Sequence, residues 1–269
     1  MGTYNCLREL TEVPQELMDL SFVFVDDEEA KVEEQLENRK EYDSETAILE
    51  IDFCNDWIAK FRVIHNVMTV VFENQDYAKV MKDSYFGTEL PQKGLLLENM
   101  NGVMHPSQPN YLAMISGSTH RVFYDFNVDI SAVDIRNNDT RCANIVHASQ
   151  LDSDARDGNL PNYIFFTPDM NNDGHDTDLS YASKWLQNFL ELKLVDPVYR
   201  NTLFFITFDE SETYFGNHIY SLLIGAGVVP GTVDKTKYTH YSFLATVEAL
   251  FGLGNLGQND AKAPRIPLC

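Results

Sequence analysis

The sequence predicts an α/β protein with a mostly parallel sheet that is covered by helices on both faces. From residue 63 onward, short apolar segments alternate with amphipathic segments of helical length. The apolar segments are rich in β-branched and aromatic residues, which is typical of strands buried on both faces. Polar loops follow several of them directly, at the edge where parallel α/β sheets place functional side chains. A chain of 269 residues can hold one large domain of this class.

The strands and helices are assigned from hydrophobic periodicity and from the turn residues that bound each run. The predicted strands cover residues 63–72, 94–100, 162–167, 201–208 and 218–227. The predicted helices cover residues 76–81, a segment beginning near residue 111, residues 179–194 and residues 241–253. In the helix at 179–194, a stripe at helical spacing is expected to pack on the core, and it consists of Tyr181, Trp185, Phe189 and Leu192.

The chain is strongly acidic, with a formal net charge of −21. This charge argues against nucleic acids and anionic membranes as partners, because both bind to basic surfaces. It would also repel an anionic substrate such as a phosphate ester. A phosphate-ester substrate would therefore need a local cation at its binding site.

Residues 1–62 differ in composition from the rest of the chain. They hold seventeen Asp and Glu against six Lys and Arg, which gives a net formal charge of −11. The charged run at 26–43 is interpreted as a solvated helix or a partly disordered segment. An acidic arm that binds a protein partner is the alternative. The sequence therefore predicts an N-terminal acidic segment at 1–62 and a folded domain at 63–269.

The four cysteines and the N-terminal residues give little indication of compartment. The cysteines are widely spaced and form no CxxC pair, so no thiolate zinc site is expected. The N-terminal residues lack the basic-then-apolar order of a signal peptide. No apolar run approaches the roughly 20 residues that span a bilayer. A soluble protein without a membrane span is expected, and no localisation is assigned.

Two acid-bearing pairs, Glu73-Asn74 and Asp209-Glu210, each come directly after a predicted buried strand. Adjacent carboxylates at a strand end repel one another unless a counter-charge sits between them. Carboxylate and amide oxygens suit hard divalent cations, so a divalent metal ion is the expected cofactor. Calcium, magnesium and manganese are favoured, and histidine ligands would also admit zinc or iron.

The loop at 168–178 is the densest polar loop of the chain. Its Asp-x-Asn-x-Asp-Gly order resembles the start of an EF-hand calcium loop, but Ser180 stands where that loop needs a glutamate. The favoured interpretation is an active-site loop in which His175 meets a leaving group or a phosphoryl oxygen. Asp176 or Asp178 could orient the imidazole, and capping of the next helix is the favoured role for Asp178. The chain contains no GxSxG segment, so a serine hydrolase of that type is not indicated.

Several long motifs, in order, resemble those of the phosphoesterase family that includes acid phosphatases and bacterial-type phospholipases C. The fungal acid-phosphatase-like branch is the most similar. The motifs are ENQDY (73–77), HPSQPNYLAMISGS (105–118), LPNYIFFTPDMNNDGHDTD (160–178), TFDES (207–211) and YTHYSFLATVEALFGLG (238–254). The resemblance implies an alkaline-phosphatase-like α/β/α sandwich and hydrolysis of phosphate esters at a metal-bearing site.

The resemblance also implies roles for particular residues. The positions that match the family's metal ligands are Glu73, Asn74, Asp209 and Glu210. His105 and His175 match its phosphate-site histidines, and His240 lies in a motif typical of the family. Members are often secreted. The expected mechanism is in-line attack by a Ser or Thr hydroxyl, followed by hydrolysis of a phosphoenzyme.

The chain departs from the family near residues 130–135, where most of a block that carries the nucleophile in the family is missing. Ser131 falls about where that nucleophile would be. A metal-dependent acid phosphatase acting on phosphate monoesters is the favoured function. Two alternatives stay open: a catalytically impaired relative that binds metal or a partner, and a phospholipase C-like phosphodiesterase.

Overall fold

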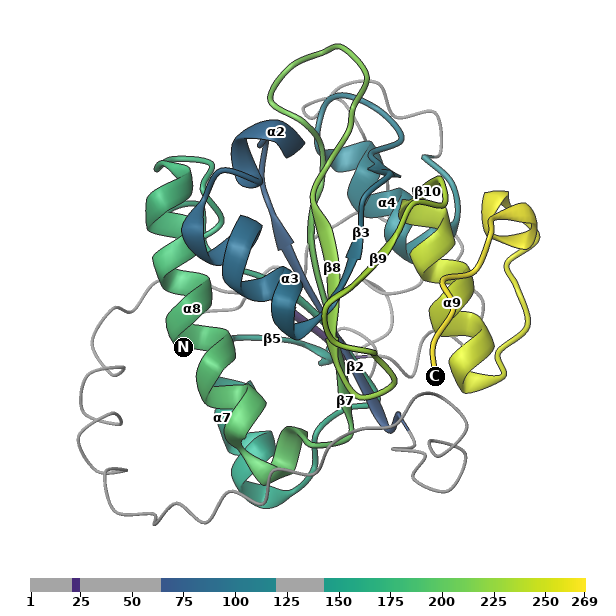
Figure 1. Ribbon diagram of the computed structural model, residues 1–269. Helices are drawn as coiled ribbons and strands as arrows, with labels where there is room; N and C mark the ends of the chain where they lie inside the picture. The colour runs from purple at the N-terminus through teal and green to yellow at the C-terminus, as the bar shows by residue number, and fades with distance from the viewer. Residues whose placement is uncertain (1–20, 25–63, 120–142) are drawn as a thin grey trace.

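The computed structural model describes residues 21–24, 64–119 and 143–269, and these residues form an α/β sandwich (Figure 1). The described strands build a central eight-stranded sheet in the order β5-β1-β6-β2-β7-β8-β3-β9. Strand β8 runs antiparallel to its neighbours β7 and β3, and the other pairings are parallel. The strands are β1 Ser21–Phe24, β2 Asn66–Phe72, β3 Leu95–Leu97, β5 Ile145–Val146, β6 Tyr163–Thr167, β7 Thr202–Phe208, β8 Ser221–Gly225 and β9 Thr232–Asp234.

Helices lie on both sides of the sheet, as the sequence predicts (Figure 1). One side carries α4 and α9, which pack on each other, and the other carries α8 with α3 and the π-helix that precedes α3. A second, two-stranded sheet joins β4 to β10. The elements outside the large sheet are α2 Tyr77–Val80, the π-helix Tyr85–Glu89, α3 Leu90–Lys93, β4 Met100–Asn101, α4 Gln108–Ser116, α7 Ser149–Asp157, α8 Leu179–Val195, the 3₁₀ helix Pro197–Tyr199, β10 Tyr238–Thr239, α9 His240–Phe251 and the 3₁₀ helix Asn259–Lys262.

Two local features differ from the sequence expectation. Strand β1 belongs to the acidic segment at 1–62, where the sequence predicts no strand, and it inserts between β5 and β6. In α8, the buried side chains are Leu179, Ala182, Ser183, Leu186 and Leu190. The predicted stripe is therefore rotated by about one residue, because Tyr181 at its start is 39% exposed. Trp185 and Phe189, which follow in that stripe, are partly buried and still pack against the core.

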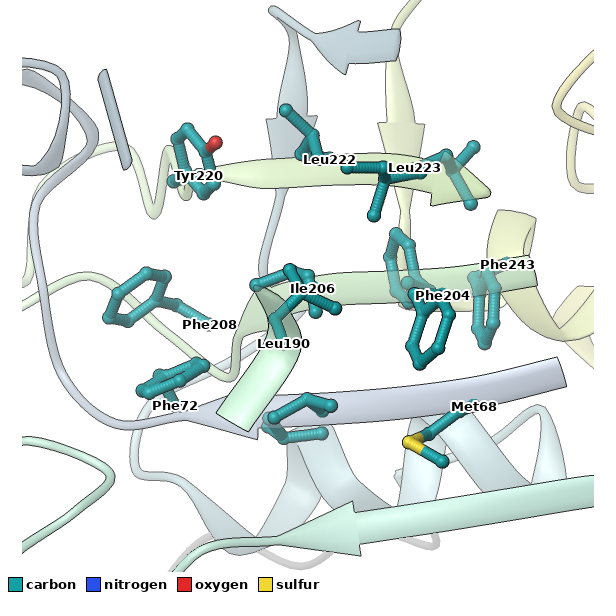
Figure 2. Packing of buried hydrophobic residues seen from close by; sticks show 14 of the residues in the cluster. Met68, Phe72, Leu190, Phe204, Ile206, Phe208, Tyr220, Leu222, Leu223 and Phe243 are labelled. Atoms are coloured by element: carbon teal, nitrogen blue, oxygen red, sulfur yellow. The ribbon is translucent and has the colours of Figure 1, made fainter. Parts of the chain in front are cut away.

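The core is built around β2 and β7, whose central residues are almost completely buried. Aromatic rings fill the space between the sheet and α8 on one side, and between the sheet and α9 on the other (Figure 2). Phe205 of β7 stacks on Phe243 of α9 with ring centroids 3.8 Å apart. Phe72, the last residue of β2, contacts Phe86 and Phe208 edge-on or tilted, each at 5.4 Å. These contacts fix the ends of both central strands.

Glu248 is a buried carboxyl group on α9 that should make stability depend on pH. It is 2% exposed, and burial together with the nearby Asp260 raises its pKa to about 7. The folded-state pKa then lies above the ordinary value of 4.5, so the contribution to stability is full below pH 4.5 and declines as the pH rises toward 7. We expect Glu248→Gln to remove this decline and to stabilise the protein at pH 8 by about 1–2 kcal/mol.

Urea unfolding at pH 4.5 and pH 8 measures this effect. The exposed Glu89, replaced by glutamine, is the matched control and should change stability little at either pH. If Glu248→Gln changed the stability equally at both pH values, ionisation of the Glu248 carboxyl group would not be the cause of the pH dependence.

Candidate active site

The two acid-bearing pairs lie side by side at one edge of the sheet. Strands β2 and β7 are parallel neighbours in which Phe72 pairs with Phe208, so the residues that follow them meet. The Asp209 amide continues the pairing by donating to the Phe72 carbonyl at 2.9 Å. Asp209 itself is completely buried, whereas Glu210 is 6% exposed. The strand pairing therefore brings together the carboxylates that the sequence places at two strand ends.

Asn74 turns the chain sharply after β2. Its φ of 52° lies in the left-handed region, which asparagine tolerates better than most residues. This turn lets the backbone amide of Asn74 donate to Asp209 Oδ1 at 3.1 Å. The hydrogen bond ties the two strand-end pairs to each other.

The loop before α4 brings a third set of side chains to the acid pairs. The Ser107 hydroxyl lies 2.9 Å from Glu73 Oε2, 3.2 Å from Glu210 Oε1 and 3.5 Å from Asn74 Oδ1. One helical turn later, the Tyr111 hydroxyl donates to the other oxygen of Glu73, Oε1. The sequence does not single out either hydroxyl. The i, i+4 spacing in the motif HPSQPNY is the signal that places both on one side of a helix.

His105, from the same loop, pairs with Glu210. Its Nδ1 lies 2.5 Å from Glu210 Oε2, and its side chain is 14% exposed. Burial lowers the pKa of His105, although the negative charge of Asp76 acts in the opposite direction. A neutral imidazole in this position carries its proton on Nδ1 and leaves Nε2 as an acceptor. Nε2 is buried and has no hydrogen-bond partner, and the ring lies against Tyr214 at 4.7 Å.

The polar loop after β6 attaches to the same edge of the sheet. The Glu73 amide donates to the Asp173 carbonyl at 3.1 Å. Burial, with a contribution from the charge of Glu73, raises the pKa of Asp173 to about 7, while the His175 amide that donates to its carboxyl group acts in the opposite direction. Asp169 accepts from the backbone amides of Asn171 and Asn172, so its side chain closes a local turn.

His175 is the exposed histidine of this loop. Its Nδ1 lies 2.7 Å from Asp176 Oδ1, which identifies Asp176 as the carboxylate that orients the ring. The hydrogen bond to Asp176 is the main cause of a raised pKa at His175, and the negative charges of Glu73 and Asp173 add to it. Asp178 caps α8 by accepting from the Tyr181 amide at 2.9 Å, which is the role favoured from the sequence.

His240 lies beneath the acid pairs at the start of α9. The side chain is completely buried, and its Nε2 lies 2.6 Å from the Asp209 carbonyl oxygen. Burial lowers its pKa to about 4, so the ring is neutral and Nε2 donates to that carbonyl. This position supports the backbone at Asp209. Ser131, the sequence candidate for the nucleophile, lies outside the described residues.

The oxygen-rich, acidic side chains of this cluster are chemically suited to bind a cation. Burial is the largest cause, and the charge of Glu73 the next, of a pKa at Asp209 well above its usual range. Its Oδ2 atom is buried and has no hydrogen-bond partner. The described residues contain no ready-made group of three or more His, Cys, Asp or Glu donors for a metal ion. The Ser107 hydroxyl instead bridges the carboxylates.

Comparison with solved structures defines the class of fold. The chain is similar to a protein of the alkaline phosphatase superfamily from Vibrio parahaemolyticus, with a TM-score of 0.52 and 12% identity over 76% of this chain and 70% of that chain. It is also similar to a lipoteichoic acid synthase from Listeria monocytogenes, with a TM-score of 0.51 and 11% identity over 78% of this chain and 80% of that chain. The chain therefore shares with both proteins an α/β fold with a mostly parallel sheet.

The sequence comparisons agree with the resemblance of the motifs. Residues 121–254 match the Phosphoesterase family. The chain is 34% identical over 253 residues to a probable acid phosphatase from Kluyveromyces lactis, covering 72% of this chain and 60% of that protein. It is 31% identical over 273 residues to an acid phosphatase from Aspergillus fumigatus, covering 77% of this chain and 61% of that protein. Residues 121–254 of the chain therefore resemble the Phosphoesterase family, in agreement with the resemblance of the motifs.

The chain spans about 60% of the length of these fungal relatives, so their activity does not transfer to it directly. In the described part of the chain, every helix is too short or too polar to cross a bilayer.

Proposed function

We propose that the protein is a metal-dependent phosphoesterase that acts as an acid phosphatase on phosphate monoesters. The observation that carries the proposal is the clustering of side-chain oxygens next to the buried Asp209. Oxygens of Glu73, Asn74 and Glu210 all lie within 3.5 Å of the Ser107 hydroxyl. Buried carboxylates of like charge are costly to hold together without a counter-charge. The match of residues 121–254 to the Phosphoesterase family, together with the fungal acid phosphatases among the similar proteins, supports the same function.

Glu73, Asn74, Asp209 and Glu210 would hold the divalent cation through their oxygen atoms. The cation would supply charge stabilisation to a phosphoryl group, which the overall negative charge of the chain would otherwise repel. Mixed carboxylate and amide ligation favours magnesium, calcium or manganese.

The histidines differ in the chemistry that they can supply. His175 is exposed and has a raised pKa, so it is suited to donate a proton to the leaving alcohol. His105 is oriented by Glu210 and presents a neutral Nε2 at the buried side of the site. His240 is a positioning residue that holds the Asp209 carbonyl. A Ser or Thr hydroxyl would attack phosphorus, and Ser131 is the candidate that the sequence provides.

The test is hydrolysis of 4-nitrophenyl phosphate between pH 4 and pH 8, before and after treatment with a chelator. We expect hydrolysis that disappears with the chelator and returns with added magnesium, manganese or calcium. Calorimetric titration of the chelated protein with each ion measures binding independently of turnover. The exposed Asp157 on α7, replaced by asparagine, should bind and hydrolyse normally.

The same experiment separates the alternatives. Faster turnover of bis(4-nitrophenyl) phosphate than of the monoester would identify a phosphodiesterase. Folded, metal-loaded protein without turnover of either ester would contradict the enzymatic proposal and favour a catalytically impaired relative.

A further inference from the structure

We propose that Tyr214 and Phe215 bind the organic group of the phosphate ester, and that this group is aromatic. The inference rests on the proposed phosphoesterase function and names the class of substrate that the site would take. Both residues lie in the aromatic loop, residues 211–217, which follows the acid pair at the end of β7. Three observations carry the inference: the exposure of the two rings, their place beside His105, and the hydrogen bonds that hold the loop.

The two rings of the aromatic loop are open to solvent. Phe215 is 93% and Tyr214 75% exposed, the two largest values among the large hydrophobic residues in the described part of the chain. Isolated apolar side chains are ordinary on a protein surface, whereas adjacent ones beside a polar site are typical of ligand binding. An apolar group that covered the two rings would remove them from water, and this burial would favour binding.

Tyr214 places the loop against the candidate active site. Its ring lies on the His105 ring, with centroids 4.7 Å apart and an angle of 33° between the planes. His105 in turn pairs with Glu210 at 2.5 Å, so one imidazole separates the Tyr214 ring from the acid pairs. The loop between β7 and β8 extends past the sheet at the carboxyl end of β7 (Figure 1). A phosphoryl group held at the acid pairs can therefore direct its organic group toward the two rings.

Hydrogen bonds hold the aromatic loop in one shape. At its base, Asn217 Oδ1 accepts from the Ser211 amide at 2.9 Å, and Asn217 Nδ2 donates to the Met104 carbonyl at 2.9 Å. Nearer the tip, the amide and the hydroxyl of Thr213 both donate to Asp76 Oδ1 at 3.0 Å. A loop that is already ordered loses little conformational entropy when a ligand binds, so more of the contact energy contributes to affinity.

The chemistry of the loop favours an uncharged aromatic group. Glu212 is the one charged residue in the sequence 211–217, and its carboxylate pairs with Lys79 at 3.1 Å. Phe215 has no polar atom, so it offers no hydrogen bond to a sugar or another hydroxylated group. An aromatic ring, in contrast, gains from edge-to-face or offset stacking on both side chains. A phenyl or naphthyl ester fits these contacts.

Binding of two phosphonates that differ by one phenyl group tests the proposal without turnover. Benzylphosphonate and methylphosphonate carry the same anionic group, and neither has an ester bond to hydrolyse. Each is titrated calorimetrically into the full-length protein in a buffer that contains magnesium, calcium and manganese. We expect benzylphosphonate to bind about ten-fold more tightly, which corresponds to about 1.4 kcal/mol.

Three variants assign this preference to the loop. Phe215→Ala should lose most of the about ten-fold preference, and Phe215→Trp should retain it because an aromatic ring is present again. Val195→Ala is the matched control, because Val195 is 74% exposed at the last position of α8, and it should behave like the native protein. Since the Phe215 ring is exposed, its replacement should leave the fold intact, which circular dichroism checks.

Hydrolysis of 1-naphthyl phosphate and glycerol 2-phosphate gives the kinetic counterpart. In Phe215→Ala, the KM for 1-naphthyl phosphate should rise about ten-fold with little change in kcat, because the ring contact is the same in the ground state and the transition state. Both constants for glycerol 2-phosphate should stay at the native values.

The outcomes separate the inference from the proposed function. An active protein that binds both phosphonates equally would overturn the inference and leave the proposed function intact. A Phe215→Ala variant that keeps the native preference would do the same. A native protein that neither binds a phosphonate nor hydrolyses an ester would refute both.

Discussion

Replacing Asp209 with asparagine is expected to reduce turnover sharply and, at the same time, to stabilise the metal-free protein. The carboxyl group is completely buried, and burial and the charge of Glu73 raise its pKa well above the usual range. Near pH 7 it therefore destabilises the folded state, because the unfolded chain ionises it freely. Asparagine has the same shape and removes this cost. It also removes a charged ligand from the proposed cation site.

The expected loss of kcat/KM is on the order of 10³, which corresponds to several kcal/mol of transition-state stabilisation. We expect the melting temperature of the chelated variant to rise by a few degrees at pH 7, and this gain to vanish below the unfolded-state pKa of 3.8. Addition of metal should raise the melting temperature of the native protein but not that of the variant.

Thermal melts with and without chelator, at pH 7 and at pH 3.5, measure both effects beside the activity assay. Asp157→Asn on α7 carries the same change of charge at an exposed position and should alter neither quantity. A variant that is less stable than the native protein at pH 7 in chelator would show that Asp209 stabilises the metal-free fold. Full activity in the variant would remove Asp209 from the proposed metal site.

The strand-end carboxylates could be predicted from the sequence because sheet geometry determines where they meet. A buried run such as residues 66–72 or 202–208 identifies a strand, and parallel neighbours bring their carboxyl ends to the same edge. The acids after β2 and β7 are therefore brought together by topology alone. The same reasoning requires no knowledge of the loops between them.

The hydroxyl groups of the site could not be predicted in this way. Ser107 and Tyr111 lie in a loop and a short helix, where no hydrophobic period indicates which side chain faces the acids. The burial of a polar side chain is equally hard to predict from the sequence. His240 follows a polar segment that suggests exposure, but packing of α9 against the sheet buries it completely beneath Asp209.

Strand β1 shows a second limit of sequence patterns. Residues 21–24 form a short apolar run, SFVF, directly before the acidic residues that begin at Asp26. Four residues are too few to establish a period, and the surrounding charge favours a solvated segment. Pairing with both β5 and β6 is a tertiary interaction that supplies what the local pattern lacks.

Phe72→Ala is expected to cause the largest loss of stability, about 3–5 kcal/mol. The Phe72 ring is completely buried and contacts Phe86, Phe208 and Trp185 with centroids 5.4 to 6.0 Å away. Removing it leaves a cavity between the sheet and α8. Phe215→Ala is the matched control, because that ring is 93% exposed and its removal should cost less than about 0.5 kcal/mol.

The same substitution tests whether the core positions the candidate active site. The Phe72 carbonyl accepts from the Asp209 amide, and Glu73 is the next residue, so a shift at the end of β2 would move both acids. Urea unfolding gives the loss of stability, and kcat/KM is then measured where the variant is fully folded. We expect kcat/KM to fall as well, because small displacements of catalytic groups are costly. Unchanged kcat/KM in fully folded variant would show that backbone pairing alone holds the site in place.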